Sequence, residues 1–157
     1  MSEIVLVDGV HNYSNVEQYV PPKSKAVQEH LKWFMGLKLG IMMHYAPESQ
    51  LGICESWPLS DGDAEWSRED VDWTDDMDEF KEQYINANKT FNPVKFRPDE
   101  WAKIAKECGF KYLLFTTKHH DGFCMFDTKT TDYKITDPSC PFHKHKYADM
   151  VKHLYDA

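Results

Sequence analysis

The chain has 157 residues, of which 41% are hydrophobic and 28% charged, a composition typical of a folded globular protein and not of a disordered one. Its 18 basic and 26 acidic residues give a formal net charge of −8, which argues against nucleic acid or an anionic membrane as a partner. No apolar run approaches membrane-spanning length and the four cysteines form no C-x-x-C pair, so we expect reduced thiols and a cytoplasmic location.

The first third of the chain predicts an arm, a helix and a short strand. Residues 1–23 lack periodicity and predict a lead-in arm. From Ser24 the apolar residues follow helical spacing up to Gly36, which predicts an amphipathic helix with Val27, Leu31 and Phe34 on one face. Residues 39–45 form a short apolar run that predicts a buried strand with His44 at its tip.

A long loop and a second helix come next. Residues 50–74 contain glycine, proline and three tryptophans with little periodicity, and loops of this length in a compact domain are usually functional or partly disordered. Residues 75–87 then predict a helix with acidic residues in its first turn.

The most regular helix of the sequence begins at Pro98. Its apolar residues fall at positions i, i+3, i+4 and i+7, namely Trp101, Ile104, Ala105 and Cys108, and Gly109 is placed to cap its end. Residues 112–116 follow at once and predict a strand buried on both faces. A helix joined to a strand by so short a connection is typical of a βαβ unit.

The second predicted strand ends in five residues that are polar or glycine, Lys118-His119-His120-Asp121-Gly122. Ligands bind at the carboxyl ends of strands in parallel α/β sheets, so we expect His44 and His119 to lie at one binding edge. A polar loop over residues 130–147 and a helix over residues 147–155 complete the chain. The predicted fold class is α/β, and two parallel strands with bare edges predict the beginning of a larger fold.

Three kinds of site fit the residues after the second strand. Metal ligation needs His119, His120 and Asp121 to turn out of the strand, because neighbouring residues on a strand point to opposite faces. A nucleophilic triad is disfavoured, because no Ser or Cys stands in a G-x-S-x-G context. Binding of a polyhydroxylated ligand suits the imidazoles, since each supplies one hydrogen-bond donor and one acceptor.

The run Lys118-His119-His120-Asp121-Gly122-Phe123 after an apolar strand resembles the α-L-fucosidases of glycoside hydrolase family 29. The helix sequence D-E-W-A-K-I-A-K over residues 99–106 and the Gly40–His44 strand are also similar to that family, as is Asp149-Met150-Val151. The resemblance implies that residues 1–157 are the N-terminal part of a single (β/α)8 TIM-type catalytic barrel, incomplete in this chain. A full barrel of this type needs about 250 residues.

The resemblance also implies which residues contact the sugar. Its substrate-binding set is His44, Glu55, Trp57, His119 and His120, with Glu65 and Trp66 as a rival to the pair from the first loop. The sequence departs from the family where His44-Tyr45-Ala46 replaces His-Trp-Gly and where Glu55-Ser56-Trp57 replaces an adjacent Glu-Trp.

The implied function is a retaining exo-glycosidase that releases terminal α-L-fucose from fucosylated carbohydrates, without a cofactor or a metal. The nucleophile and the acid/base of such an enzyme are implied to lie on later barrel strands, so we assign no catalytic residue and expect the chain alone to be inactive. Two alternatives stay open: a metal-dependent hydrolase or metal-binding module built on His119, His120 and Asp121, and a small sugar-binding module. The sequence does not indicate the linkage specificity or the oligomeric state.

Overall fold

A computed structural model describes residues 21–60, 62 and 64–157. The chain divides into two compact units, Met1–Lys38 and Leu39–Ala157, which we describe separately. The predicted lead-in arm, residues 1–23, lies almost wholly outside the described residues.

The described part of the first unit consists mainly of helix α1 (Lys25–Leu37), which confirms the helix predicted from Ser24. Gly36 lies inside the helix and does not follow its end; the helix stops at Lys38, whose φ of 65° is left-handed. The predicted apolar face of α1 is exposed at Val27, Leu31 and Phe34, and none of the helical residues is buried.

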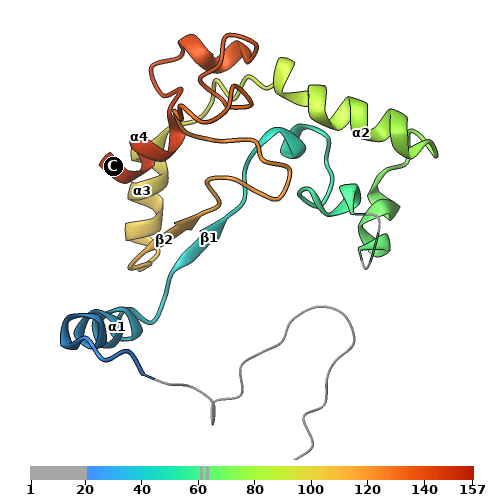
Figure 1. The fold of residues 1–157 in the computed structure, drawn as a ribbon. Coiled ribbons are helices and arrows are strands. Elements are labelled where there is room, and N and C mark those ends of the chain that lie inside the picture. Colours follow the sequence, from blue (N-terminus) through green and yellow to red (C-terminus); the bar gives the residue numbers. More distant parts are fainter. Residues whose placement is uncertain (1–20, 61, 63) are drawn as a thin grey trace, which may run out of the picture. The chain divides into compact units, whose positions relative to one another are not determined.

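The second unit contains a two-stranded parallel sheet formed by β1 (Ile41–Met43) and β2 (Leu113–Phe115) (Figure 1). The register pairs Ile41 with Leu113 and Met43 with Phe115. Backbone hydrogen bonds continue the pairing past both ends, from the Lys111 N–H to the Leu39 carbonyl and from the Thr116 N–H to the Met43 carbonyl. The prediction that the second strand is buried on both faces is wrong. Met42 is 63% exposed and its partner Leu114 is 48% exposed, because the packing of the unit covers only the face that carries Phe115.

Helices α3 (Pro98–Glu107) and α4 (Met150–Asp156) pack against each other on one side of the sheet (Figure 1). The helix predicted from Pro98 is confirmed, and Gly109 follows it with a left-handed φ of 84°. Only part of its predicted apolar face is covered, since Trp101 packs into the core whereas Ile104 and Cys108 are exposed.

The last helix begins three residues later than predicted. The carboxylate of Asp149 accepts a hydrogen bond from the Lys152 backbone N–H, which makes it the N-cap of α4. The cap satisfies an N–H group that has no partner within the helix, so the helix starts at Met150.

Helix α2 (Met77–Asn86) lies apart from α3 and α4, on the other side of the segments that follow the strands (Figure 1). The Asp76 side chain accepts hydrogen bonds from the backbone N–H groups of Asp78 and Glu79, which fixes the start of the helix. The other segments that the structure describes contain the short 3₁₀-helices η2 (Pro47–Gln50), η3 (Trp57–Leu59), η4 (Glu65–Asp70), η5 (Ala87–Lys89) and η6 (Pro141–Lys144).

Most of the hydrophobic core is built by segments outside the sheet. The main cluster of buried residues comprises Ala46, Phe91, Phe96, Phe123, Met125, Ile135, Cys140, Phe142, Ala148 and Met150. A smaller cluster of Ile53, Phe80 and Tyr84 joins α2 to the first long loop. Because the loops bury their own aromatic residues, they form defined structure where the sequence shows no periodicity.

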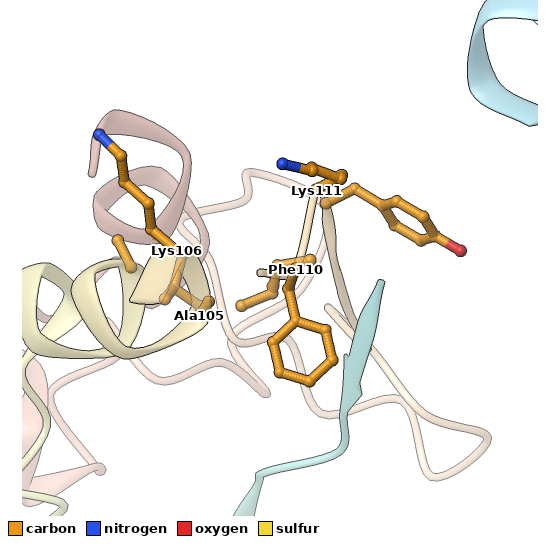
Figure 2. A pocket seen from close by; sticks show the side chains of 8 residues that line it. Ala105, Lys106, Phe110 and Lys111 are labelled. Atoms are coloured by element: carbon orange, nitrogen blue, oxygen red, sulfur yellow. The ribbon is translucent and has the colours of Figure 1, made fainter. Parts of the chain in front are cut away.

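A hollow of about 170 Å³ lies where α3, the start of β2 and α4 meet, and its lining includes Ala105, Lys106, Phe110 and Lys111 (Figure 2). These residues precede or begin β2, so the hollow is at the opposite end of the strand from the imidazoles. Among the described residues, no helix is both long and apolar enough to cross a membrane.

Candidate functional site

The carboxyl ends of the two strands bring His44 and His119 together. His44 directly follows β1, and the Thr116 backbone N–H donates to the Met43 carbonyl. The two segments therefore still run side by side where they leave the sheet. The two imidazole centroids are 5.8 Å apart in an edge-to-face arrangement. The predicted meeting of the two histidines at one edge is confirmed.

Glu55 lies between the two imidazoles. Its Oε2 atom is 2.9 Å from His119 Nε2, and its Oε1 atom is 3.3 Å from His44 Nδ1. The indole Nε1–H of Trp57 also donates to Oε2, at 3.0 Å. The Glu55 carboxylate thus contacts three nitrogen groups from three separate parts of the chain.

The backbone at Glu55 adopts a left-handed φ of 53°, a conformation that non-glycine residues rarely adopt. Such a conformation costs roughly 1–3 kcal/mol and persists only where surrounding contacts hold it. Here the contacts to Trp57, His44 and His119 hold the carboxylate side chain in place.

Trp57 and His120 extend the group on its exposed side. The Trp57 ring centroid lies 5.7 Å from that of His120, and the two imidazoles His119 and His120 are 4.8 Å apart. Of the two carboxylate–tryptophan pairs considered from sequence, only Glu55 and Trp57 touch the histidines. Glu65 is exposed, and Trp66 reaches the group by packing on Trp57 at 6.4 Å.

His119 is the most enclosed of the three histidines, with a side chain 9% exposed. Burial lowers the pKa of its imidazole, an effect that the neighbouring Glu55 carboxylate partly offsets. The Ser56 hydroxyl is hydrogen-bonded to His119 Nδ1. The ring is therefore fixed on both nitrogens, by a hydroxyl on one and a carboxylate on the other.

Asp121 anchors the segment that carries His119 and His120. Its carboxylate accepts a hydrogen bond from the buried Tyr84 hydroxyl at 2.9 Å and another from the Phe123 backbone N–H at 3.1 Å. Gly122 between them has a left-handed φ of 88°, which favours glycine there. Asp121 thus ties the His119–His120 turn to helix α2.

A second carboxylate, Glu48, lies buried near the group and is only 4% exposed. Burial raises its pKa to about 7, and the negative charges of Asp121 and Glu55 add to that effect. Its Oε2 atom and the hydroxyl of Tyr133 are both buried without a hydrogen-bond partner among the described residues. A carboxyl group in this setting is protonated below neutral pH.

The structure brings all five predicted binding residues into one group: His44, Glu55, Trp57, His119 and His120. It does not bring Asp121 to the imidazoles as the metal-ligand alternative required. Sequence reasoning missed Ser56, Tyr84 and Glu48. Ser56 has a signal in its position between Glu55 and Trp57. Tyr84 falls within the helix predicted over residues 75–87, with no sign of its polar contact, and nothing in the sequence indicates burial of Glu48.

The family model for alpha-L-fucosidases matches residues 7–157. The chain belongs to the alpha-L-fucosidase family. A curated relative within it, alpha-L-fucosidase 1 of Arabidopsis thaliana, is 44% identical over 45 residues, which are 29% of this chain and 9% of the relative.

Solved structures of the family agree with this fold. Alpha-L-fucosidase AlfC from Lactobacillus casei, in complex with its α-L-fucose product, superposes with a TM-score of 0.58 at 32% identity over 82% of this chain. Alpha-L-fucosidase isoenzyme 1 from Paenibacillus thiaminolyticus superposes with a TM-score of 0.62 at 31% identity over 83% of this chain. The chain spans only 36% and 26% of these two structures.

Proposed function

We propose that this chain supplies the fucose-binding part of an alpha-L-fucosidase, an enzyme that releases terminal α-L-fucose from glycoconjugates. The observation that carries the proposal is the convergence of His44 and His119 on Glu55 at the carboxyl ends of two parallel strands. Family membership supports it, as does the L. casei relative, whose structure holds the α-L-fucose product.

The chemistry of the group suits a sugar. The Glu55 carboxylate can accept hydrogen bonds from sugar hydroxyls, and the imidazoles can accept or donate them. Together they can bind two or more hydroxyls of a pyranose. Trp57 offers an apolar ring beside these polar atoms, and its N–H already orients Glu55. The contacts that hold His119 and Glu55 are made by side chains of the protein itself, so the group is preorganised for binding.

We further propose that the two strands are the first two of a (β/α)8 barrel and that the catalytic carboxylates lie outside this group. A retaining glycosidase needs two carboxyl groups about 5–5.5 Å apart on either side of the scissile bond. The Glu55 carboxylate already contacts three nitrogen groups. The Asp121 carboxylate already accepts hydrogen bonds from the Tyr84 hydroxyl and the Phe123 N–H. Each of these two carboxylates is therefore better suited to hold substrate or protein than to attack carbon.

Fucose binding to the 157-residue chain tests the proposal, measured by saturation-transfer NMR with α-methyl fucoside. We expect binding to the chain and at least tenfold weaker binding to His44→Ala and Glu55→Gln. His30→Ala is the matched control, because His30 is an exposed imidazole on α1. Equal binding to galactoside and fucoside, or no loss in Glu55→Gln, would count against a fucose site.

An assay with a chromogenic fucoside tests the division of roles. We expect no turnover above background from the chain alone, and Asp121→Asn and Glu55→Gln then leave that background unchanged. Turnover that disappears in either variant contradicts the proposal, since it assigns catalysis to a carboxylate that we place in binding or anchoring.

A further inference from the structure

We propose that His44, Glu55 and His119 also form a binding site for Zn²⁺, and that the metal ion competes with the sugar for this group. The metal site stands on the geometry of these three side chains alone. Only the competition rests on the proposed function.

The three side chains offer a donor set that zinc prefers. Two imidazole nitrogens and one carboxylate are common ligands of Zn²⁺, and three protein ligands leave a fourth position open. Oxygen-preferring Ca²⁺ and Mg²⁺ are disfavoured, because two of the three donors are nitrogen. Among the residues that the structure describes, this is the group of His, Cys, Asp and Glu side chains that comes close enough for shared ligation.

The distances fit a tetrahedral ion after a small movement. Metal–ligand bonds of about 2.1 Å at tetrahedral angles place ligand atoms about 3.4 Å apart. Glu55 Oε1 lies 3.3 Å from His44 Nδ1 and Glu55 Oε2 lies 2.9 Å from His119 Nε2, so each oxygen of the carboxylate faces one imidazole. One ligand atom from each of the three residues lies within 4.8 Å of the other two. His44 is the exposed member, so its ring can close the remaining distance without disturbing buried packing.

Ser56 allows His119 to serve as a metal ligand. Without metal, the Ser56 hydroxyl can donate to Nδ1 while the Nε2–H donates to Glu55. With metal, the tautomer reverses: the Nδ1–H donates to the Ser56 oxygen and the Nε2 lone pair faces the ion. A hydroxyl serves both states because it is donor and acceptor.

Trp57 supplies a second outer contact, because its indole N–H holds Glu55 Oε2. Metal-ligating carboxylates are usually oriented by such hydrogen bonds. The same contacts that prepare the group for a sugar therefore prepare it for an ion. A sugar and an ion need the same nitrogen and oxygen atoms, so both cannot bind at once.

Titration calorimetry of the chelator-treated 157-residue chain with ZnCl₂ tests the metal site. We expect one Zn²⁺ per chain and at least tenfold weaker binding to His44→Ala and to Glu55→Gln. His30→Ala is the control, and circular dichroism and thermal unfolding establish that each variant is folded. Co²⁺ offers a second readout that does not depend on affinity, because a tetrahedral site gives strong visible absorption that His44→Ala should abolish.

Zinc binding that survives in His44→Ala and Glu55→Gln overturns the proposal, since it places the ion on other imidazoles such as His143 or His145. Absence of any binding overturns it as well.

Competition is measured by fucoside binding with and without saturating Zn²⁺, where we expect the fucoside signal to fall at least tenfold. Zinc binding without fucoside binding supports the metal site and contradicts the proposed function. Fucoside binding without zinc binding supports the proposed function and contradicts the metal site. Simultaneous binding of fucoside and zinc contradicts the competition.

Discussion

The segments that follow the strands are better packed than the strands themselves. No residue of β1 or β2 is buried, and Met42 and Leu114 stand exposed side by side in the register. The segments beyond the strands contain fully buried Phe123, Met125 and Phe142. An ordinary parallel α/β sheet shows the opposite distribution, with buried strands and exposed connections.

This difference shows which parts of the molecule hold the candidate site in place. His119 and His120 are held by a turn anchored through Asp121 to α2 and through Phe123 to the main hydrophobic cluster. Glu55 is held by its contacts with Trp57 and the imidazoles. The site geometry thus depends on the packed segments around it, and the sheet mainly sets where the two histidines begin.

The largest expected effect is at Phe142, whose buried ring lies in the main cluster. Phe142→Ala should lower the free energy of unfolding by about 3–5 kcal/mol, because it removes apolar contacts and leaves a cavity. Urea denaturation of the chain measures this loss. Phe142→Leu is the matched variant and should recover most of it. A negligible loss in Phe142→Ala would mean that the cluster tolerates a cavity and is not the stabilising region.

Glu48→Gln should change how stability depends on pH. The folded state keeps the Glu48 proton up to about pH 7, whereas the unfolded chain releases it near its ordinary value of 4.5. Stability therefore falls as pH rises through this window and stays low above it, by on the order of 3 kcal/mol. The glutamine variant lacks this loss and should be the more stable protein at pH 8.

Thermal unfolding from pH 5 to pH 9 measures this effect. Glu82→Gln is the control, because Glu82 is exposed on α2. A wild-type stability that rises between pH 5 and pH 8 while Glu48→Gln stays flat would show that the buried carboxyl is ionised and stabilised by a partner.

Tyr84→Phe should affect both stability and the site, because it removes the hydroxyl that donates to Asp121. Loss of this bond to a charged group should cost about 1.5–3 kcal/mol, and the ring itself stays packed. Fucoside binding should weaken several-fold, because the His119–His120 turn is no longer anchored to α2. Tyr155→Phe, on an exposed tyrosine, is the control; unchanged fucoside binding in Tyr84→Phe would show that the turn is rigid without this anchor.

The elements that the sequence predicted well are those with strong local signals. Proline at the first turn and glycine after the end marked α3, and the apolar runs ending in histidine marked β1 and β2 and their common edge. Burial was predicted less well, because it depends on what covers each face. Met42 and Leu114 have the composition of a buried strand, yet their face is open in this chain.

The candidate site divides in the same way. The sequence could identify His44, His119 and His120 because they follow apolar strand-like runs closely. The preference for Glu55 with Trp57 over Glu65 with Trp66 required the family resemblance. Tyr84 and Asp121 are 37 residues apart, so no local pattern could reveal their contact. In sequence, Glu48 resembles any surface glutamate. It is buried on η2, which packs against η5, a segment far away along the chain.

The smallest expected effect is at Leu114, on the exposed face of β2. Leu114→Thr introduces a β-branched residue, which suits a strand, and removes apolar surface that is already half exposed, so the free energy of unfolding should change by less than about 1 kcal/mol. Ile135→Thr is the matched change at a fully buried position and should cost several times more. A large loss in Leu114→Thr would mean that this sheet face is covered in solution. Sedimentation velocity would then separate two explanations. Self-association gives a dimer of the wild-type chain that the variant abolishes, whereas coverage within one chain leaves the wild-type protein monomeric.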